Sequence, residues 1–149
     1  MCYAVYIGTS IKQNVGTYIP DQTDLYLNLL MSEKEMVGLK PKFIKQHLYY
    51  VGSCEGCFCG FSYDPTDTNV GSNYDMKEES KTIKSLQALI NLIDELTQKD
   101  DLEFYCCWEG DWEFPIEENI EIDIRQISLG KNYFGLTERQ FISFKKQIE

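Results

Sequence analysis

Three cysteines lie close together in the sequence and could bind a metal ion. Cys54, Cys57 and Cys59 form a C-x-x-C-x-C pattern within residues 50–64, YVGSCEGCFCGFSYD. Zinc is commonly held by four thiolate or imidazole ligands in a tetrahedral arrangement, so this turn needs one further ligand. The candidates for the fourth ligand are Cys2, Cys106, Cys107 and His47. Zinc held by the three cysteines is therefore one hypothesis, although the chain has no second C-x-x-C pair.

The same C-x-x-C spacing occurs in dithiol oxidoreductases, so a thiol-redox reaction is a second form of this hypothesis. In those proteins the first cysteine lies at a helix N-terminus, where the helix dipole lowers the pKa of the thiol. Here the motif continues into FCGFSYDP, which is typical of a strand, and Glu55 has the wrong charge to lower a thiol pKa. The favoured interpretation is that Gly52, Gly56 and Gly60 shape a tight hairpin whose cysteines fill small spaces.

Little else in the sequence is typical of a catalytic site. His47 is the only histidine, so a Ser/His/Asp triad would require it, and a nucleophile and base pair of Cys54 and His47 would require the two to meet. The acids of EGDWE lack the ligand spacing of a calcium loop, and no phosphate-binding or dinucleotide-binding glycine motif occurs. We therefore predict no catalytic residues and no cofactor apart from the alternative zinc, and we favour a protein that is not an enzyme.

Negative charge is concentrated in residues 94–123. This segment has twelve acidic residues and one base, Lys99, which gives a formal charge of −11, whereas the rest of the chain sums to +1. It also contains WEGDWEF, in which aromatic side chains stand beside carboxylates. Carboxylates accelerate the approach of a basic partner, and an exposed aromatic ring can anchor the contact. We therefore predict a binding surface for a basic protein, made by Glu109, Asp111, Trp112 and Glu113.

The alternative for this stretch is a solvated loop whose charges keep the protein soluble while Trp108 belongs to the core. Trp112 separates the two interpretations best. It follows the predicted strand in a turn-like segment, EGDWEFP, where no alternation predicts burial. If Trp112 is exposed, alanine at this position should leave folding intact and weaken partner binding.

Composition and charge exclude several classes of fold and partner. The chain has 149 residues, of which 43% are hydrophobic, and this is enough to form a core without disulfide bonds or metal ions. A formal net charge of −10 argues against nucleic acids and anionic membranes as partners, since both attract basic proteins. The N-terminal MCYAVYIG is unlike a signal peptide, and no apolar run has the length of a membrane span. We expect one domain over residues 1–149, located in the cytoplasm, with its cysteines as free thiols.

The hydrophobic pattern predicts short strands in the first half of the chain. Residues 2–8 are rich in β-branched and aromatic side chains, and residues 25–29, LYLNL, alternate in the manner of a strand. The stretch SEKEMVG indicates a helix or a loop. Pro41 disfavours a helix around it, so the next strand is expected over about residues 47–52. The cysteine turn and a returning GFSY strand would then form a hairpin.

A long amphipathic helix is the clearest element in the second half. Residues 64–79 have few apolar side chains and predict a long loop, after which Ser80 is a suitable N-cap for a helix that extends to Gln98. Apolar residues then recur at steps of three and four, the pattern of a helix with one buried face. These residues are Ile83, Leu86, Leu89, Ile90, Ile93 and Leu96.

Strands are expected on both sides of the acidic segment. Alternation over residues 102–108 predicts a strand in which Cys106 and Cys107 face opposite sides of a sheet. Residues 120–124 alternate isoleucine with charged side chains, and residues 137–146 favour a closing strand over a helix. The predicted fold class is α+β, with a mostly antiparallel sheet of six or seven short strands and one long amphipathic helix packed on one face.

Three stretches of the chain give it a resemblance to other proteins. They are the N-terminal MCYAVYIG, the cysteine turn YYVGSCEGCFCGFSYD and, after the predicted helix, FYCCWEGDWE. In this combination the chain resembles a group of small bacterial proteins of unknown function that share a G-C-x-C-G-F turn and a C-W-E-G-D stretch. The resemblance covers most of the chain. It implies that these two stretches meet in space, and it implies no activity.

Overall fold

The structure is a computed structural model that describes residues 3–55, 61, 76–127 and 136–148. Its elements follow one another as β1 (Tyr3–Thr9), β2 (Leu25–Asn28), α1 (Glu33–Leu39), the 3-10 turn η1 (Lys40–Lys42), β3 (His47–Ser53), α2 (Met76–Thr97), β4 (Leu102–Trp108), β5 (Glu118–Ile122), the 3-10 turn η3 (Ile124–Gln126) and β6 (Gln140–Phe144).

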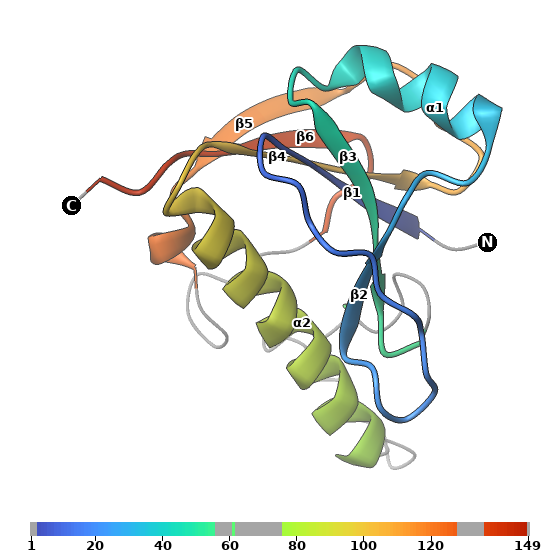
Figure 1. Ribbon diagram of the computed structural model, residues 1–149, viewed down its shortest axis with the longest axis vertical. Coiled ribbons are helices and arrows are strands. Elements are labelled where there is room, and N and C mark those ends of the chain that lie inside the picture. Colours follow the sequence, from blue (N-terminus) through green and yellow to red (C-terminus); the bar gives the residue numbers. More distant parts are fainter. Residues whose placement is uncertain (1–2, 56–60, 62–75, 128–135, 149) are drawn as a thin grey trace.

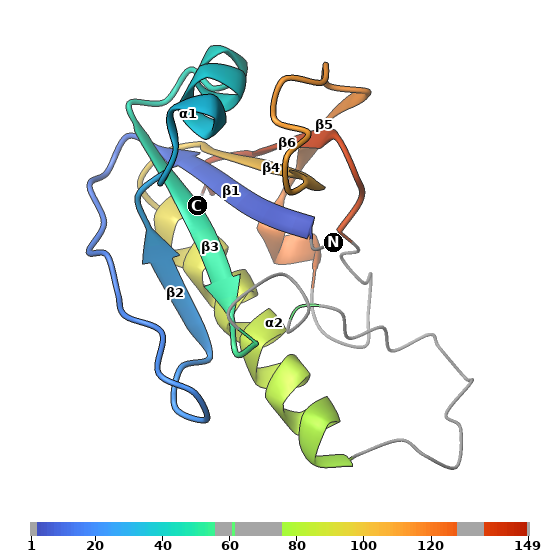
Figure 2. The ribbon, with the colours of Figure 1, turned by 90° about the vertical axis from the view of Figure 1, so that its right-hand side faces the viewer.

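The six strands form one sheet in the order β2-β3-β1-β4-β6-β5. Every neighbouring pair is antiparallel except β5 and β6, which are parallel. The long helix α2 lies on one side of the sheet, and the short helix α1 lies on the other (Figure 1, Figure 2). The predicted α+β class is therefore confirmed, and a second helix covers the face that the sequence left open.

The face of the sheet next to α2 carries an apolar core. All but one of the six periodic apolar residues of α2 are buried, and Ile83 is half-buried. They pack against inward-facing residues of the central strands, among them Val5, Ile7, Phe104 and Cys106. The three- and four-residue spacing places these side chains on one stripe of the helix, which is why its buried face could be predicted.

The start of α2 differs from the prediction. The helix begins at Met76, four residues before Ser80, so Ser80 is not its cap and residues 76–79 do not belong to a loop. The sequence there is MKEE, which consists of residues with good helix propensity. The remainder of the predicted loop and the predicted GFSY strand fall almost entirely outside the described residues.

A second, smaller core lies on the face next to α1. It contains Ala4, Tyr6, Leu39, Phe43, Tyr105, Cys107 and Phe141. Strand β4 is therefore buried on both faces, as expected for a central strand with helices on either side. Cys106 belongs to the α2-side core and Cys107 to the α1-side core, which confirms that the two thiols face opposite ways.

The other predicted strands are close to those observed. The expectations for residues 2–8, 25–29, 47–52 and 137–146 correspond to β1, β2, β3 and β6. In β5, Ile120 and Ile122 are half-buried as predicted, whereas Ile124 lies in η3 beyond the end of the strand. The carboxylate of Asp123 accepts the backbone N–H of Arg125 at 3.0 Å and so favours a 3-10 turn there.

Candidate functional site

Most carboxylates of residues 94–123 have structural partners. Glu103 is buried, and its carboxylate accepts the backbone N–H groups of Ile44 and Lys45 at 3.0 and 2.7 Å. Asp100 accepts hydrogen bonds from Ser10 at 2.6 Å and Lys45 at 2.9 Å, and these bonds lower the pKa of its carboxyl group to about 2. Asp100 and Glu103 therefore bind neighbouring segments of this chain, and their carboxylates are not free to contact another protein.

Five further acids of this segment are also bonded. Asp101 accepts the backbone N–H of Lys146, and Asp94 accepts the side-chain amide of Gln147. Three more acids form ion pairs: Glu117 with Arg139, Glu121 with Lys145 and Asp123 with Arg125. The charge that the sequence concentrates in one segment is therefore divided among several places in the fold.

The three predicted acids of EGDWE are different. We call residues 109–114 the acidic turn. Glu109 and Glu113 are exposed and Asp111 is half-buried, and none of their carboxylates forms a hydrogen bond or ion pair with a residue that the structure describes. The turn is closed by the backbone N–H of Asp111, which donates to the carbonyl oxygen of Trp108. Gly110 has a φ of 101°, a backbone conformation that favours glycine. The turn therefore brings three unpaired carboxylates together directly after β4.

Trp112 is placed differently from its prediction. Its side chain is half-buried against the α1-side core, and its indole N–H donates to the hydroxyl oxygen of Tyr6 at 2.8 Å. The Tyr6 hydroxyl in turn donates to the carboxylate of Glu35 in α1 at 2.7 Å. This buried chain of hydrogen bonds joins three distant segments, so no local pattern could indicate it. Trp112 anchors the turn to the core and is not an exposed contact.

Helix α1 contacts the backbone of the acidic turn directly. A Cβ atom on Gly38 would lie 2.6 Å from the carbonyl carbon of Trp112, so only glycine fits at this position. The ammonium of Lys42 donates to the carbonyl oxygens of Trp112 at 2.7 Å and Gly38 at 2.9 Å, and partial burial lowers the pKa of this ammonium. Lys42 therefore fixes the turn from the side of α1.

Arg139 fixes the C-terminal side of the same turn. Its Nε donates to the carbonyl oxygen of Pro115 at 2.9 Å, and its guanidinium group lies 5.4 Å from the ring centroid of Phe114. Its backbone has a φ of 57°, a left-handed conformation that is uncommon for a residue with a side chain. The backbone N–H of Arg139 donates to the backbone carbonyl oxygen of Cys106 at 2.7 Å, and this bond holds the backbone of Arg139 in this conformation. Neither Lys42 nor Arg139 was singled out from the sequence.

The predicted thiol site is described only in part. Cys54 is half-buried and its backbone N–H donates to Ser85 of α2, whereas Cys57 and Cys59 lie outside the described residues. Within the described ranges, no three His, Cys, Asp or Glu side chains are grouped in a way that could hold a metal ion. The zinc and redox hypotheses for Cys54, Cys57 and Cys59 therefore remain predictions.

The other thiols do not form a reactive pair. His47 is the first residue of β3 and Cys54 follows its last residue, Ser53; the strand between them spans about 20 Å at roughly 3.3 Å per residue, so they cannot act as nucleophile and base. Burial raises the pKa of both the Cys106 and the Cys107 thiol, to about 12 for Cys107. The thiolate is the nucleophile, so these two cysteines are unreactive near neutral pH.

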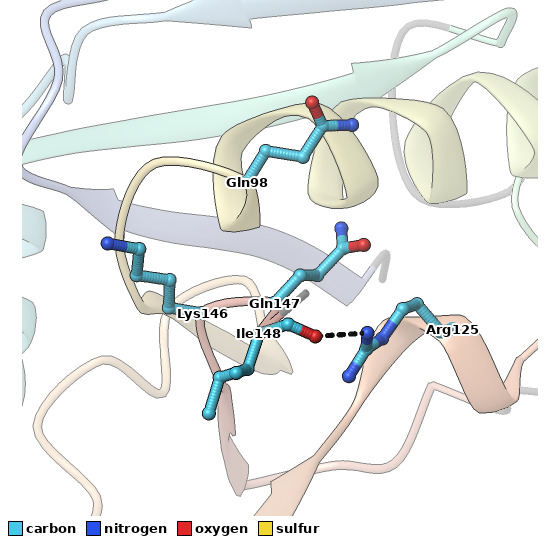
Figure 3. A pocket seen from close by; sticks show the side chains of 5 residues that line it. All are labelled: Gln98, Arg125, Lys146, Gln147 and Ile148. Carbon is cyan, nitrogen blue, oxygen red and sulfur yellow. Dashed lines mark hydrogen bonds between the residues drawn. The ribbon is translucent and has the colours of Figure 1, made fainter.

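A cavity of about 760 Å³ lies at the C-terminal end of α2, lined by Gln98, Arg125, Lys146, Gln147 and Ile148 (Figure 3). Arg125 donates through Nη1 to the carbonyl oxygen of Ile148 and through Nε and Nη2 to the carboxylate of Asp123. The amide of Gln147 donates to Asp94 and Thr97. These polar groups hold the C-terminal segment in place and are not available to bind an anion.

None of the described helices combines the length and the apolar composition needed to cross a membrane. The turn named in the resemblance to small bacterial proteins lies mostly outside the described residues, so its position relative to the acidic turn stays a prediction. No protein-family model, curated protein or solved structure matches this chain.

Proposed function

We propose that this chain is a non-catalytic binding domain that captures a basic patch of another protein on the acidic turn. The observation that carries the proposal is the contrast in pairing within residues 94–123. Glu109, Asp111 and Glu113 form no hydrogen bond or ion pair with a described residue, whereas seven of the other nine acids of the segment do. The remaining two, Glu95 in α2 and Glu118 in β5, lie on separate elements, so the acidic turn is where unpaired acids stand together. A cationic partner would give these three carboxylates the ion pairs that the fold does not supply.

The backbone of the acidic turn is held before a partner arrives. Lys42 binds one side of it, Arg139 binds the other, and the indole of Trp112 is fixed by Tyr6. Lys42 contacts a carbonyl oxygen of the turn and Arg139 contacts that of Pro115 just after it, and neither cation forms an ion pair with the three carboxylates. A segment that is already ordered loses less conformational entropy on binding, so more of the interaction energy contributes to affinity.

Phe114 takes the aromatic role that the sequence assigned to Trp112. Its side chain is 50% exposed, and one contact with the Arg139 guanidinium orients the ring. An exposed ring beside unpaired carboxylates suits a partner that presents arginine or lysine, because a cation can pair with the acids and rest against the ring. Trp112 acts on binding only through the position of the turn.

The test measures binding of a fluorescein-labelled, arginine-rich peptide by fluorescence anisotropy at low and at physiological salt. A triple variant, Glu109→Gln, Asp111→Asn and Glu113→Gln, should weaken binding by about tenfold or more, equivalent to roughly 1.4 kcal/mol. The matched control is Glu33→Gln, Glu95→Gln and Glu118→Gln, three exposed acids outside the turn whose removal changes the net charge equally. The control should retain most of the affinity and the salt dependence.

Two outcomes would contradict the proposal. If both triple variants weaken binding equally, the peptide responds to net charge and the acidic turn is not a site. If Phe114→Ala leaves affinity unchanged while its melting temperature matches that of the native chain, the aromatic contact is wrong. Folding of each variant is checked by far-UV circular dichroism, so that a loss of binding is not a loss of structure.

A further inference from the structure

A shallow apolar pocket lies between α1 and the ends of β2 and β3. Its volume is about 300 Å³, and its apolar lining comes from Leu29, Leu30, Met36, Leu48 and Tyr49. Leu29 and Met36 are 58% and 40% exposed, so the pocket opens to solvent. Met36 and Gly38 are two residues apart in α1, about 200° around the helix, which places this pocket and the acidic turn on opposite flanks of α1.

Exposed apolar side chains gather in the same part of the chain. Of the nine large hydrophobic residues that are exposed in the described ranges, five lie within residues 29–44: Leu29, Met31, Met36, Val37 and Ile44. Scattered exposed apolar residues are normal, but two of these five, Leu29 and Met36, line the same pocket, which is typical of an interaction surface. Two of the five are methionines, whose flexible side chains adapt to different apolar partners.

The charge around the pocket is opposite to that of the whole chain. The pocket lining includes Lys40 and His47 and no acidic residue, although acids outnumber bases 24 to 14 in the chain. Residues 29–48 contain four lysines and two glutamates, but Lys42 is bonded to the acidic turn and Lys45 pairs with Asp100, so Lys40 is the lysine that lines the pocket. The carboxylate of one of these glutamates, Glu35, is already bonded to Tyr6 and to the backbone of Met31. The charge complement of this surface is therefore acidic.

The neighbouring strand offers little room for a partner that adds a strand to the sheet. The carbonyl oxygen of Leu27 in β2 already accepts the backbone N–H of Gly16, and the backbone N–H of Leu29 donates to the side chain of Asn28. Strand addition depends on free backbone groups at a sheet edge, whereas a helix binds a groove through its side chains alone. The pocket therefore suits a helical partner better than an extended one.

We propose that this surface binds an acidic amphipathic helix of another protein, with an apolar side chain in the pocket and carboxylates near Lys40. The site goes beyond the acidic turn and is independent of it, because it lies on the other flank of α1 and has the opposite charge preference. A second copy that met this one through the same surface would bring the same basic charge to the pocket. The test below separates a helical partner from a membrane surface.

The test uses two labelled helical peptides with the same leucine face, one with glutamate and one with glutamine at all other positions. The full chain should bind the glutamate peptide at least about tenfold more tightly, as complementary charge predicts. Met36→Glu and Leu29→Glu should each reduce this binding by about tenfold or more. The matched control is Val15→Glu, an equally exposed apolar residue in the segment before β2, which should leave binding unchanged.

Each contrary result identifies a different error. Absence of binding, or equal binding of both peptides, overturns the proposed partner. An equal loss in Met36→Glu and Val15→Glu overturns the pocket as the site. If sedimentation shows that the native chain is a dimer and that Met36→Glu is a monomer, the surface binds a second copy. If the native chain binds phosphatidylserine vesicles and Met36→Glu does not, the surface binds a membrane. The acidic-turn triple variant should keep the affinity for the glutamate peptide, so the two proposals fail separately.

Discussion

The two faces of the sheet are stabilised in different ways. The α2 face is an apolar core in which a helix of 22 residues packs one stripe of side chains against the central strands. The α1 face joins a helix of seven residues to the acidic turn through a buried chain of hydrogen bonds, Trp112 to Tyr6 to Glu35. Apolar packing tolerates adjustment, whereas a buried polar network requires every partner. We therefore expect the α1 face to control the position of the acidic turn.

The largest expected effect is on the α2 face. Ile90 is 7% exposed in the apolar core, so Ile90→Asp places an unpaired carboxylate there and should lower the free energy of unfolding by several kcal/mol. Ile122→Asp in β5 should destabilise less, because Ile122 is only half-buried. Urea denaturation measures both. The control is Asn91→Asp, the next residue of α2 and exposed, which should change stability little.

The α1 face gives a sharper comparison, because two buried tyrosines stand opposite each other. Tyr6 in β1 pairs with Tyr105 in β4, and both are fully buried. The Tyr6 hydroxyl has two hydrogen bonds, whereas that of Tyr105 has no partner among the described residues. Tyr6→Phe should cost about 1–3 kcal/mol by leaving Trp112 and Glu35 unsatisfied, and Tyr105→Phe should be neutral or stabilising.

Thermal and urea unfolding of the two tyrosine variants would decide the role of the network. If Tyr6→Phe and Tyr105→Phe lower the free energy of unfolding equally, the two hydrogen bonds of the Tyr6 hydroxyl do not contribute to stability. Trp112→Ala, which the sequence alone suggested would fold normally, should now be destabilising as well. Its loss removes both packing against the α1-side core and the hydrogen bond to Tyr6.

The smallest effect is expected at Asp100, between α2 and β4. Its folded-state pKa of about 2 lies below the usual 3.8, so its carboxylate stabilises the fold above about pH 4, and this contribution is lost as the pH falls toward 2. Because the side chain is 40% exposed, Asp100→Asn should cost less than about 1 kcal/mol at pH 7. Melting temperatures of the two proteins should converge by pH 2, and a constant difference would exclude the charge as its cause.

The sequence predicted the elements whose information is local. The spacing of apolar residues in α2 and the alternation in β4 identified buried faces correctly, because each pattern lies within one element. The start of α2 was missed because a favourable N-cap at Ser80 was given more weight than the helix-forming residues before it. Sequence patterns identify faces more reliably than they identify ends.

The candidate site could be predicted only in part. Glu109 and Glu113, which the sequence predicted as part of a binding surface, are exposed, and their role in binding stays a prediction. The role of Trp112 was missed because it depends on Tyr6 and Glu35, which are 106 and 77 residues away in the chain. Six of the twelve acids are bonded by groups far from them in the chain, and a charge count along the chain carries no information about such partners.

The close approach of Gly38 to Trp112 has a consequence for stabilising this protein by design. Glycine within a helix is normally replaced by alanine to gain about 0.5–1 kcal/mol, and α1 contains one glycine. Here the added methyl group would meet the backbone of Trp112 at 2.6 Å and push the turn away from the helix. Gly38→Ala, a routine substitution for thermostability, would therefore displace the acidic turn by steric contact while leaving every charge in the protein unchanged.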